Sequence, residues 1–249
     1  MPGRYSGVRK SSREGNILEI RGFIKTSLID YPGEICATLF TAGCNLRCPF
    51  CHNRDLVLDP GNQPLFPETE VLEFLTRRSR QLGGICISGG EPTLQEGLPD
   101  FAARVKSIGL KVKLDTNGTR PNVLRDLLSR GLLDYVAVDI KAPRAKYDYL
   151  TGVAMDYQDV LETIALLREN PVEHEFRTTF VPGLLQAADI IAIVRELAGC
   201  CHYVLQKFQS SVTLLDPTLN HTRVPYPAKM EELARRCREY VDLVELRGY

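Results

Sequence analysis

The sequence lacks an excess of charge of either sign. It contains 31 Lys and Arg residues and 31 Asp and Glu residues, and the basic residues are spread along the chain rather than gathered in one stripe. A protein that binds nucleic acid through charge needs a basic patch, so we expect no nucleic-acid partner.

Long apolar stretches are also missing. Residues 1–15 are polar and include Arg4, Arg9, Lys10 and Arg13, so they lack the apolar run of a signal peptide. No later stretch approaches the roughly 18 consecutive apolar residues that indicate a membrane-spanning helix. We therefore expect a cytoplasmic protein without a membrane partner, whose residues 1–16 form a flexible N-terminal segment.

The cysteines are interpreted in the light of this expected location. The chain has 8 cysteines, and three of them, Cys44, Cys48 and Cys51, are crowded into one short segment. Because disulfides are typical of exported proteins, this pattern favours metal ligation over cross-linking.

Short apolar segments rich in β-branched residues alternate with segments of helical period. Strands are expected at residues 35–40, 85–88, 112–114, 135–138, 176–181 and 203–205. Helices are expected at residues 68–81, 98–107, 122–129, 157–169, 188–198 and 228–240. This alternation is typical of an α/β protein with a parallel sheet. It contains too few units for an eight-fold barrel, so we expect a partial (β/α)6 barrel with an N-terminal β-hairpin over residues 18–40, in a single domain of residues 17–249.

Polar residues follow almost every expected strand. They are Cys44, then Gly89, Gly90 and Glu91, then Asp115, Thr116 and Asn117, then Asp139 and Lys141, and finally Gln206 and Lys207. In barrels of this kind the C-terminal ends of the strands carry the chemistry. The sequence therefore predicts one active site at this rim.

The spacing of the three cysteines is C-x3-C-x2-C. Three thiolates can surround one iron–sulfur cube and leave its fourth iron without a protein ligand, and an open position of this kind is typical of a catalytic metal. The alternatives are three unrelated thiols or a zinc site, and for a zinc site His52 lies too close in sequence to Cys51 to complete a comfortable tetrahedron.

Two of the rim segments have a simpler alternative. Two adjacent glycines let a backbone approach a ligand closely, and Glu91 can accept hydrogen bonds from an ammonium group, but glycine pairs are also common in turns. Asp115 and Asp139 can instead cap the helices that follow them.

These motifs together resemble the radical S-adenosylmethionine (SAM) superfamily, whose cysteine motif has an aromatic residue before its last cysteine, here Phe50. The resemblance covers about residues 22–208. It implies a 4Fe–4S cluster bound by the three cysteines, with SAM chelating the open iron.

The resemblance also implies roles for the rim residues. Phe50, Gly89, Gly90, Glu91, Asp115, Asn117, Lys141 and Gln206 would contact SAM, with Glu91 near its amino group and Lys141 near its carboxylate. Lys141 and Asp115 would be the catalytic residues. Asp115, Thr116 and Asp139 would bind a monovalent cation beside the SAM carboxylate, because hard oxygen ligands suit such an ion.

Residues 27–33 and 51–55 are similar to segments of the enzymes that activate glycyl radical enzymes, especially the group that activates anaerobic ribonucleoside-triphosphate reductase. This implies a glycyl radical enzyme as partner and flavodoxin or ferredoxin as electron donor. Two alternatives stay open: a radical SAM enzyme with a small-molecule substrate, such as a deazapurine synthase, and a non-catalytic iron–sulfur redox protein.

Overall fold

The computed structural model describes residues 17–210, 213–222 and 227–249 of the chain. The segment expected to be flexible, residues 1–16, lies outside them. The described residues contain an eight-stranded sheet in which the strands follow one another in sequence order. They are β1 (Ile20–Ser27), β2 (Cys36–Thr41), β3 (Gly84–Gly89), β4 (Lys111–Thr116), β5 (Tyr135–Asp139), β6 (Glu173–Phe180), β7 (His202–Lys207) and β8 (Leu243–Arg247).

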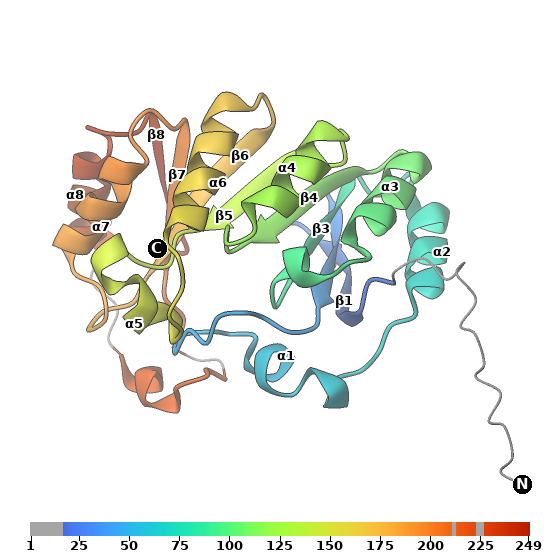
Figure 1. The fold of residues 1–249 in the computed structure, drawn as a ribbon, viewed down its shortest axis with the longest axis horizontal. Helices are drawn as coiled ribbons and strands as arrows, with labels where there is room; N and C mark the ends of the chain where they lie inside the picture. Colours follow the sequence, from blue (N-terminus) through green and yellow to red (C-terminus); the bar gives the residue numbers. More distant parts are fainter. Residues whose placement is uncertain (1–16, 211–212, 223–226) are drawn as a thin grey trace, which may run out of the picture.

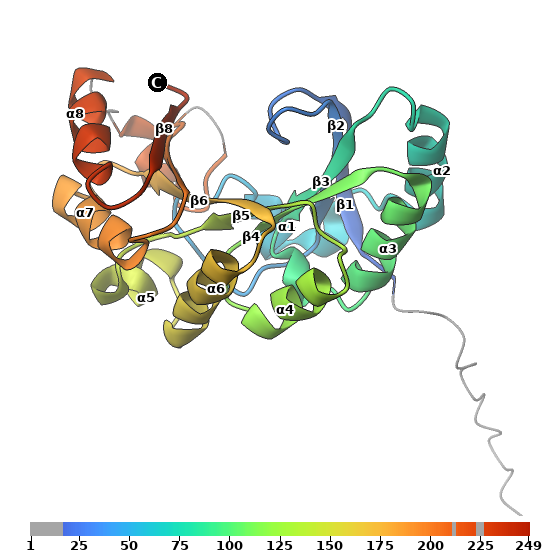
Figure 2. The same cartoon turned by 90° about the horizontal axis from the view of Figure 1, so that it is seen from above.

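The sheet is parallel except at its first strand. β1 pairs antiparallel with β2, and each pair from β2–β3 to β7–β8 is parallel. The predicted N-terminal hairpin is therefore confirmed, as is the open α/β sheet. Figure 2 shows the sheet curved into an open arc rather than closed into a barrel.

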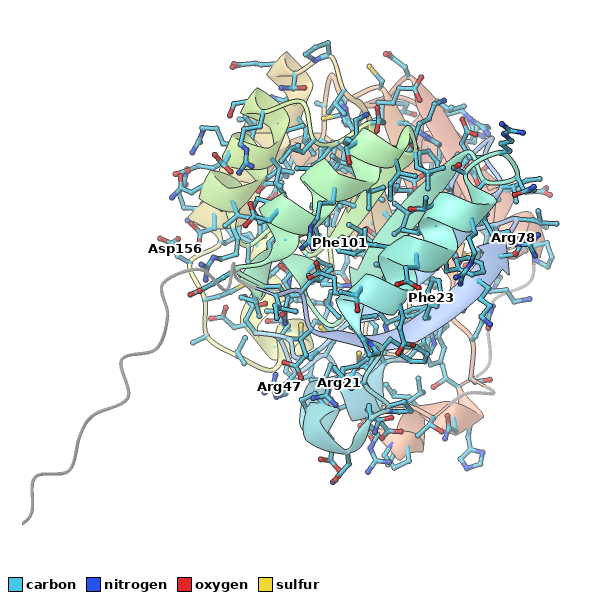
Figure 3. The ribbon with its side chains drawn as sticks, turned by 90° about the vertical axis from the view of Figure 1, so that its right-hand side faces the viewer. Arg21, Phe23, Arg47, Arg78, Phe101 and Asp156 are labelled. Carbon is cyan, nitrogen blue, oxygen red and sulfur yellow. The ribbon has the colours of Figure 1, made fainter. Side chains whose placement is uncertain are left out.

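Helices connect the parallel strands and cover the outer side of the arc (Figures 1 and 2). The helices are α1 (Arg54–Leu58), α2 (Glu68–Arg78), α3 (Leu98–Ile108), α4 (Pro121–Ser129), α5 (Tyr147–Thr151), α6 (Gln158–Glu169), α7 (Ala187–Glu196) and α8 (Pro227–Cys237). Figure 3 shows α2 and α3 in front of the sheet, with Phe101 on α3. Phe101 is fully buried, so this layer forms part of the main core.

The strands separate apolar from polar side chains by their two-residue period. In β4, Val112 and Leu114 pack into the core beneath the helices, whereas Lys113 and Asp115 line the cavities on the concave side. β5 repeats the pattern, because Val136 and Val138 belong to the same core and Asp139 lines the concave side. The helices therefore cover an apolar face, and the interior of the arc is polar.

Strand β8 is absent from the elements expected from the sequence. It is parallel to β7, with Gln206 opposite Arg247, and it adds a seventh parallel strand to the expected six. Its charged residues are typical of an exposed segment, but Arg247 donates two hydrogen bonds of 2.9 Å to the fully buried Glu175. This interior ion pair explains why hydrophobic patterning did not reveal the strand.

Short helices α1 and α5 were also not expected. Both lie below the sheet in Figure 1, where the segment after β2 crosses toward α5. No helix of the described residues combines the length and the apolar character needed to cross a membrane.

Candidate active site

The cysteine loop leaves β2 and is held by backbone hydrogen bonds at several points. Arg47 donates its amide to the carbonyl of Thr151 at the end of α5, at 2.7 Å. The loop 213–222 binds it from the other side, because Leu215 and Asp216 donate to the carbonyls of Cys51 and Pro49, at 3.3 and 2.8 Å. Segments distant in sequence thus fix the conformation of this loop.

Cys44, Cys48 and Cys51 line one cavity of about 320 Å³, and none of them forms a disulfide. Burial raises the pKa of all three thiols, that of Cys48 to about 12, whereas the charge of Lys141 acts in the opposite direction. Neutral thiols are therefore favoured when no metal is bound. Iron ions would supply the positive charge that deprotonates them, so this donor set fits an iron–sulfur cluster.

The Gly89-Gly90 turn packs directly on the start of the cysteine loop. Gly90 and Glu91 donate their amides to the carbonyls of Thr41 and Gly43, at 3.0 and 2.8 Å. A Cβ on Gly90 would lie 1.7 Å from the carbonyl oxygen of Gly43. Glycine is required here because two backbones approach each other too closely for any side chain.

The Glu91 carboxylate is 1% exposed and accepts four hydrogen bonds from the protein. Its Oε1 accepts from the amide and hydroxyl of Thr93 and from the hydroxyl of Thr116, and its Oε2 accepts from the amide of Asn117 at 2.7 Å. Burial raises its pKa, and these donors act against that effect. In the structure Glu91 joins the loops after β3 and β4, and its contact with the SAM ammonium, expected from the sequence, stays a prediction.

Asn117 continues this connection to the cysteine loop. Its side-chain amide donates to Oδ1 of Asn45 at 2.9 Å, and Asn45 donates to the hydroxyl of Thr119 at 2.8 Å. The loop after β4 is therefore bound both to Glu91 and to the segment beside Cys44. A displacement of one loop would move the other two.

Charged side chains from three adjacent strands meet at the floor of the cavity. Arg177 on β6 donates to Asp139 at 2.9 Å and to Asp115 at 3.3 Å. Lys141 donates to the other oxygen of Asp139 at 3.0 Å, and Lys113 donates to the other oxygen of Asp115. Each of the four carboxylate oxygens therefore contacts a nitrogen of a cationic side chain.

These contacts decide the ionisation of the cluster of charges. Burial alone would raise the pKa values of Asp115 and Asp139, but Arg177 and the lysines hold both below their ordinary range. Burial alone would lower the pKa of Lys141, but Asp139 raises it above its ordinary value. All of these groups are charged at neutral pH.

The three residues expected to hold a monovalent cation, Asp115, Thr116 and Asp139, have partners within the protein. The hydroxyl of Thr116 donates to Glu91 and accepts from the amide of Gly118, so it is engaged away from the two aspartates. The aspartate oxygens already have cationic partners.

Every site residue expected from the sequence lines this one cavity. They are Cys44, Cys48, Phe50, Cys51, Gly89, Gly90, Glu91, Asp115, Thr116, Asn117, Asp139, Lys141 and Gln206. Sequence reasoning missed Arg177, Asp30, Ser88 and Thr179, which line it as well. The signal for Arg177 was the alternation of Glu175, Arg177 and Thr179 in β6, where polar residues recur at every second position.

A second cavity of about 430 Å³ adjoins the first. The two share six lining residues, which are Asp30, His52, Asp115, Arg177, Thr179 and Gln206. The second cavity extends to Lys207, Gln209 and Arg247, and it reaches Ile29, which is 86% exposed. The concave side of the sheet is therefore continuous from the three thiols to the surface.

Comparison with known proteins agrees with this geometry. The sequence profile of the Radical SAM superfamily matches residues 38–197. A Methanocaldococcus jannaschii protein, provisionally named a glycyl-radical enzyme activating enzyme, is 34% identical over 234 residues, which are 92% of this chain and 95% of that protein. The pyruvate formate-lyase 1-activating enzyme of Escherichia coli K12 is 33% identical over 172 residues, 66% of this chain and 68% of that enzyme. The 7-carboxy-7-deazaguanine synthase of Hyperthermus butylicus is 43% identical over 124 residues, but these are only 49% of this chain and 52% of that enzyme.

The chain therefore belongs to the radical SAM superfamily. It is a radical SAM oxidoreductase, whose cofactors are a 4Fe–4S cluster and SAM, and the non-catalytic alternative is excluded. The three thiols, the close-packed glycine turn and the charged floor lie around one cavity, as binding of these cofactors requires.

Proposed function

We propose that this enzyme activates a glycyl radical enzyme by taking a hydrogen atom from one glycine of that partner. The observation that carries the proposal is the second cavity, which runs from the SAM-binding cavity to the surface beside Ile29. A short main-chain segment of another protein can enter such an opening, and glycine is the residue whose α-carbon is least shielded. The names of two relatives that match this chain support the same function.

When bound, the cluster and SAM would supply the chemistry: one electron from an external donor would split SAM into methionine and a 5′-deoxyadenosyl fragment, which would leave as 5′-deoxyadenosine with the glycine hydrogen, so that the unpaired electron stays on the partner. The residues of this chain bind, orient and exclude water. Lys141 and Arg177 present positive charge to the cavity, and the Glu91 and Asn117 contacts hold its rim in place. Positioning of this kind lowers the entropic part of the barrier.

For the particular partner we propose an anaerobic ribonucleoside-triphosphate reductase, with flavodoxin or ferredoxin as the electron donor. The support is the likeness of residues 27–33 and 51–55 to the activators of that reductase. In the structure Asp30 and His52, one from each of these segments, line both cavities.

The test is an anaerobic assay with the cluster-containing protein, a reductant, SAM and the reductase. We expect an electron paramagnetic resonance doublet from a glycyl radical on the reductase, and its disappearance when that glycine is replaced by alanine. A silent reductase together with a signal from another glycyl radical enzyme would leave the activity correct and the partner wrong.

A deazapurine synthase remains the second candidate because of the 43% identity over 124 residues. That match covers about half of each chain, whereas the match to the Methanocaldococcus jannaschii protein covers nearly all of both. The two functions differ in what stimulates release of 5′-deoxyadenosine. If a small molecule stimulates it while every glycyl radical enzyme of the source cell stays without a radical, the activator proposal is refuted.

A further inference from the structure

The charges on the cavity floor suggest how the carboxylate of SAM is bound. We propose that Arg177 and Lys113 supply the positive charge opposite Asp115 and Asp139, so that this enzyme binds SAM without a monovalent cation. The proposal rests on the cofactor, not on the identity of the protein partner.

The first argument is that the aspartate oxygens are already engaged. Arg177 bridges the two carboxylates, with its Nε at 2.9 Å from Asp139 and its Nη1 at 3.3 Å from Asp115. Its side chain is 10% exposed. A metal ion at the midpoint of the two carboxylates would have to displace this guanidinium.

The second argument is the number of charges. Lys113, Arg177 and Lys141 carry three positive charges against the two negative charges of Asp115 and Asp139. Arg177 also lies 3.7 Å from the fully buried Glu175, which accepts two hydrogen bonds from Arg247. The floor therefore holds its own cations beside both aspartates. An added cation there would meet three like charges at close range in a site of low dielectric constant, whereas the SAM carboxylate brings a negative charge.

The third argument is the position of Lys113. Its side chain is 2% exposed, and its ammonium contacts Asp115 and lies 3.7 Å from Sγ of Cys86 and 5.9 Å from the centre of the Tyr135 ring. A buried ammonium is costly unless it is paired. Its presence is explained if Asp115 requires a permanent positive partner within the protein.

The experiment measures SAM affinity of the cluster-containing protein by equilibrium dialysis, with the cluster oxidised so that no turnover occurs. Potassium, sodium and tetramethylammonium chloride are compared at equal ionic strength, about 100 mM, so that general screening is the same. We expect the wild-type affinity to differ less than about twofold between the three salts, because no site for the small cations is used. A loss of tenfold or more in tetramethylammonium would overturn the proposal without any variant.

The variant Arg177→Met tests the residue itself. It leaves Asp139 and Asp115 with one cationic partner fewer, so we expect affinity in tetramethylammonium to fall about tenfold, the effect of one charge-assisted contact. Potassium or sodium should restore part of this loss, because a small cation can then occupy the vacated position. A purely structural role of Arg177 would weaken binding equally in all three salts, and that result, or no weakening at all, would contradict the proposal.

Two further variants complete the comparison. Lys113→Met should acquire the same salt dependence, and it provides the test if Arg177→Met does not fold. Lys106→Met is the matched control, because Lys106 binds Asp134 at 2.6 Å outside the SAM cavity. The control should keep the affinity and the salt independence of the wild type. Salt dependence in the control would show that the response is not specific to the cavity floor, which would also refute the proposal.

Discussion

Replacement of Glu91 by glutamine separates two roles that the same residue can have. In Glu91→Gln the side-chain NH2 group must face either the amide of Asn117 or the three donors at the other oxygen. The first choice loses one hydrogen bond to a charged group, a contribution of about 1.5–3 kcal/mol, and weakens the other three because their acceptor is no longer charged. Burial raises the pKa of Glu91, so removal of the charge recovers part of the cost. We expect the free energy of unfolding to fall by about 2 kcal/mol or more.

The assay is urea unfolding of the cluster-free protein with its thiols reduced, followed by circular dichroism. The matched control is Glu96→Gln, because Glu96 lies five positions further along the chain and is exposed. SAM affinity of the cluster-containing variants is measured in parallel. If Glu91→Gln unfolds at the same urea concentration as Glu96→Gln but binds SAM poorly, then Glu91 acts directly on the SAM ammonium and our interpretation of its four contacts is wrong.

Three other outcomes follow from the geometry. Gly90→Ala should lower the free energy of unfolding by about 1–3 kcal/mol and reduce the amount of bound iron, because its Cβ would meet the Gly43 carbonyl. In the control Gly61→Ala the new Cβ meets no atom within 4 Å, so the free energy of unfolding and the bound iron should stay unchanged. Cys48→Ala should retain little iron after anaerobic reconstitution, while Cys201→Ala, at an exposed cysteine, should bind about four irons like the wild type; a full cluster in the first variant would refute the ligand assignment. The neighbouring cations outweigh burial and depress the pKa of Asp139 in the folded state. The ionised Asp139 therefore stabilises the fold fully above the pKa of Asp in the unfolded chain, about 3.9, and this stabilisation is lost as the pH falls below that value. Wild-type stability measured by urea should therefore fall more steeply between about pH 4 and 3 than that of Asp139→Asn, and parallel pH profiles would contradict the depressed pKa.

Much of the fold could be predicted because the outer face of the sheet and the inner faces of the helices follow simple periods. Each of the six expected strands and each of the six expected helices is present, with ends that differ by a few residues. Strand β8 was missed because its interior-facing residues, Glu245 and Arg247, are charged. Arg247 binds Glu175, which lies on β6, and it also binds Glu245 of its own strand. The contact with Glu175 forms only in the folded sheet.

The candidate site was predictable as a set because parallel strands place their C-terminal ends at one rim. Cys44, Glu91, Asp115 and Lys141 come from four separate strand ends and line one cavity. The individual contacts of these residues could not be predicted from the sequence. Arg177 carried no motif, and its role depends on the lateral distance between β6 and the aspartates of β4 and β5.

The sequence by itself determined the number and spacing of the three clustered thiols, the glycine turn and the order of the polar strand ends, because these depend on residue type and local period. Only the tertiary structure decided which groups pair with each charged side chain. The Glu91 carboxylate joins the loops after β3 and β4, and Arg177 bridges two strands. Such pairings depend on the curvature of the sheet and on burial. They join segments far apart in the chain, so no fixed spacing between residues in the sequence predicts them.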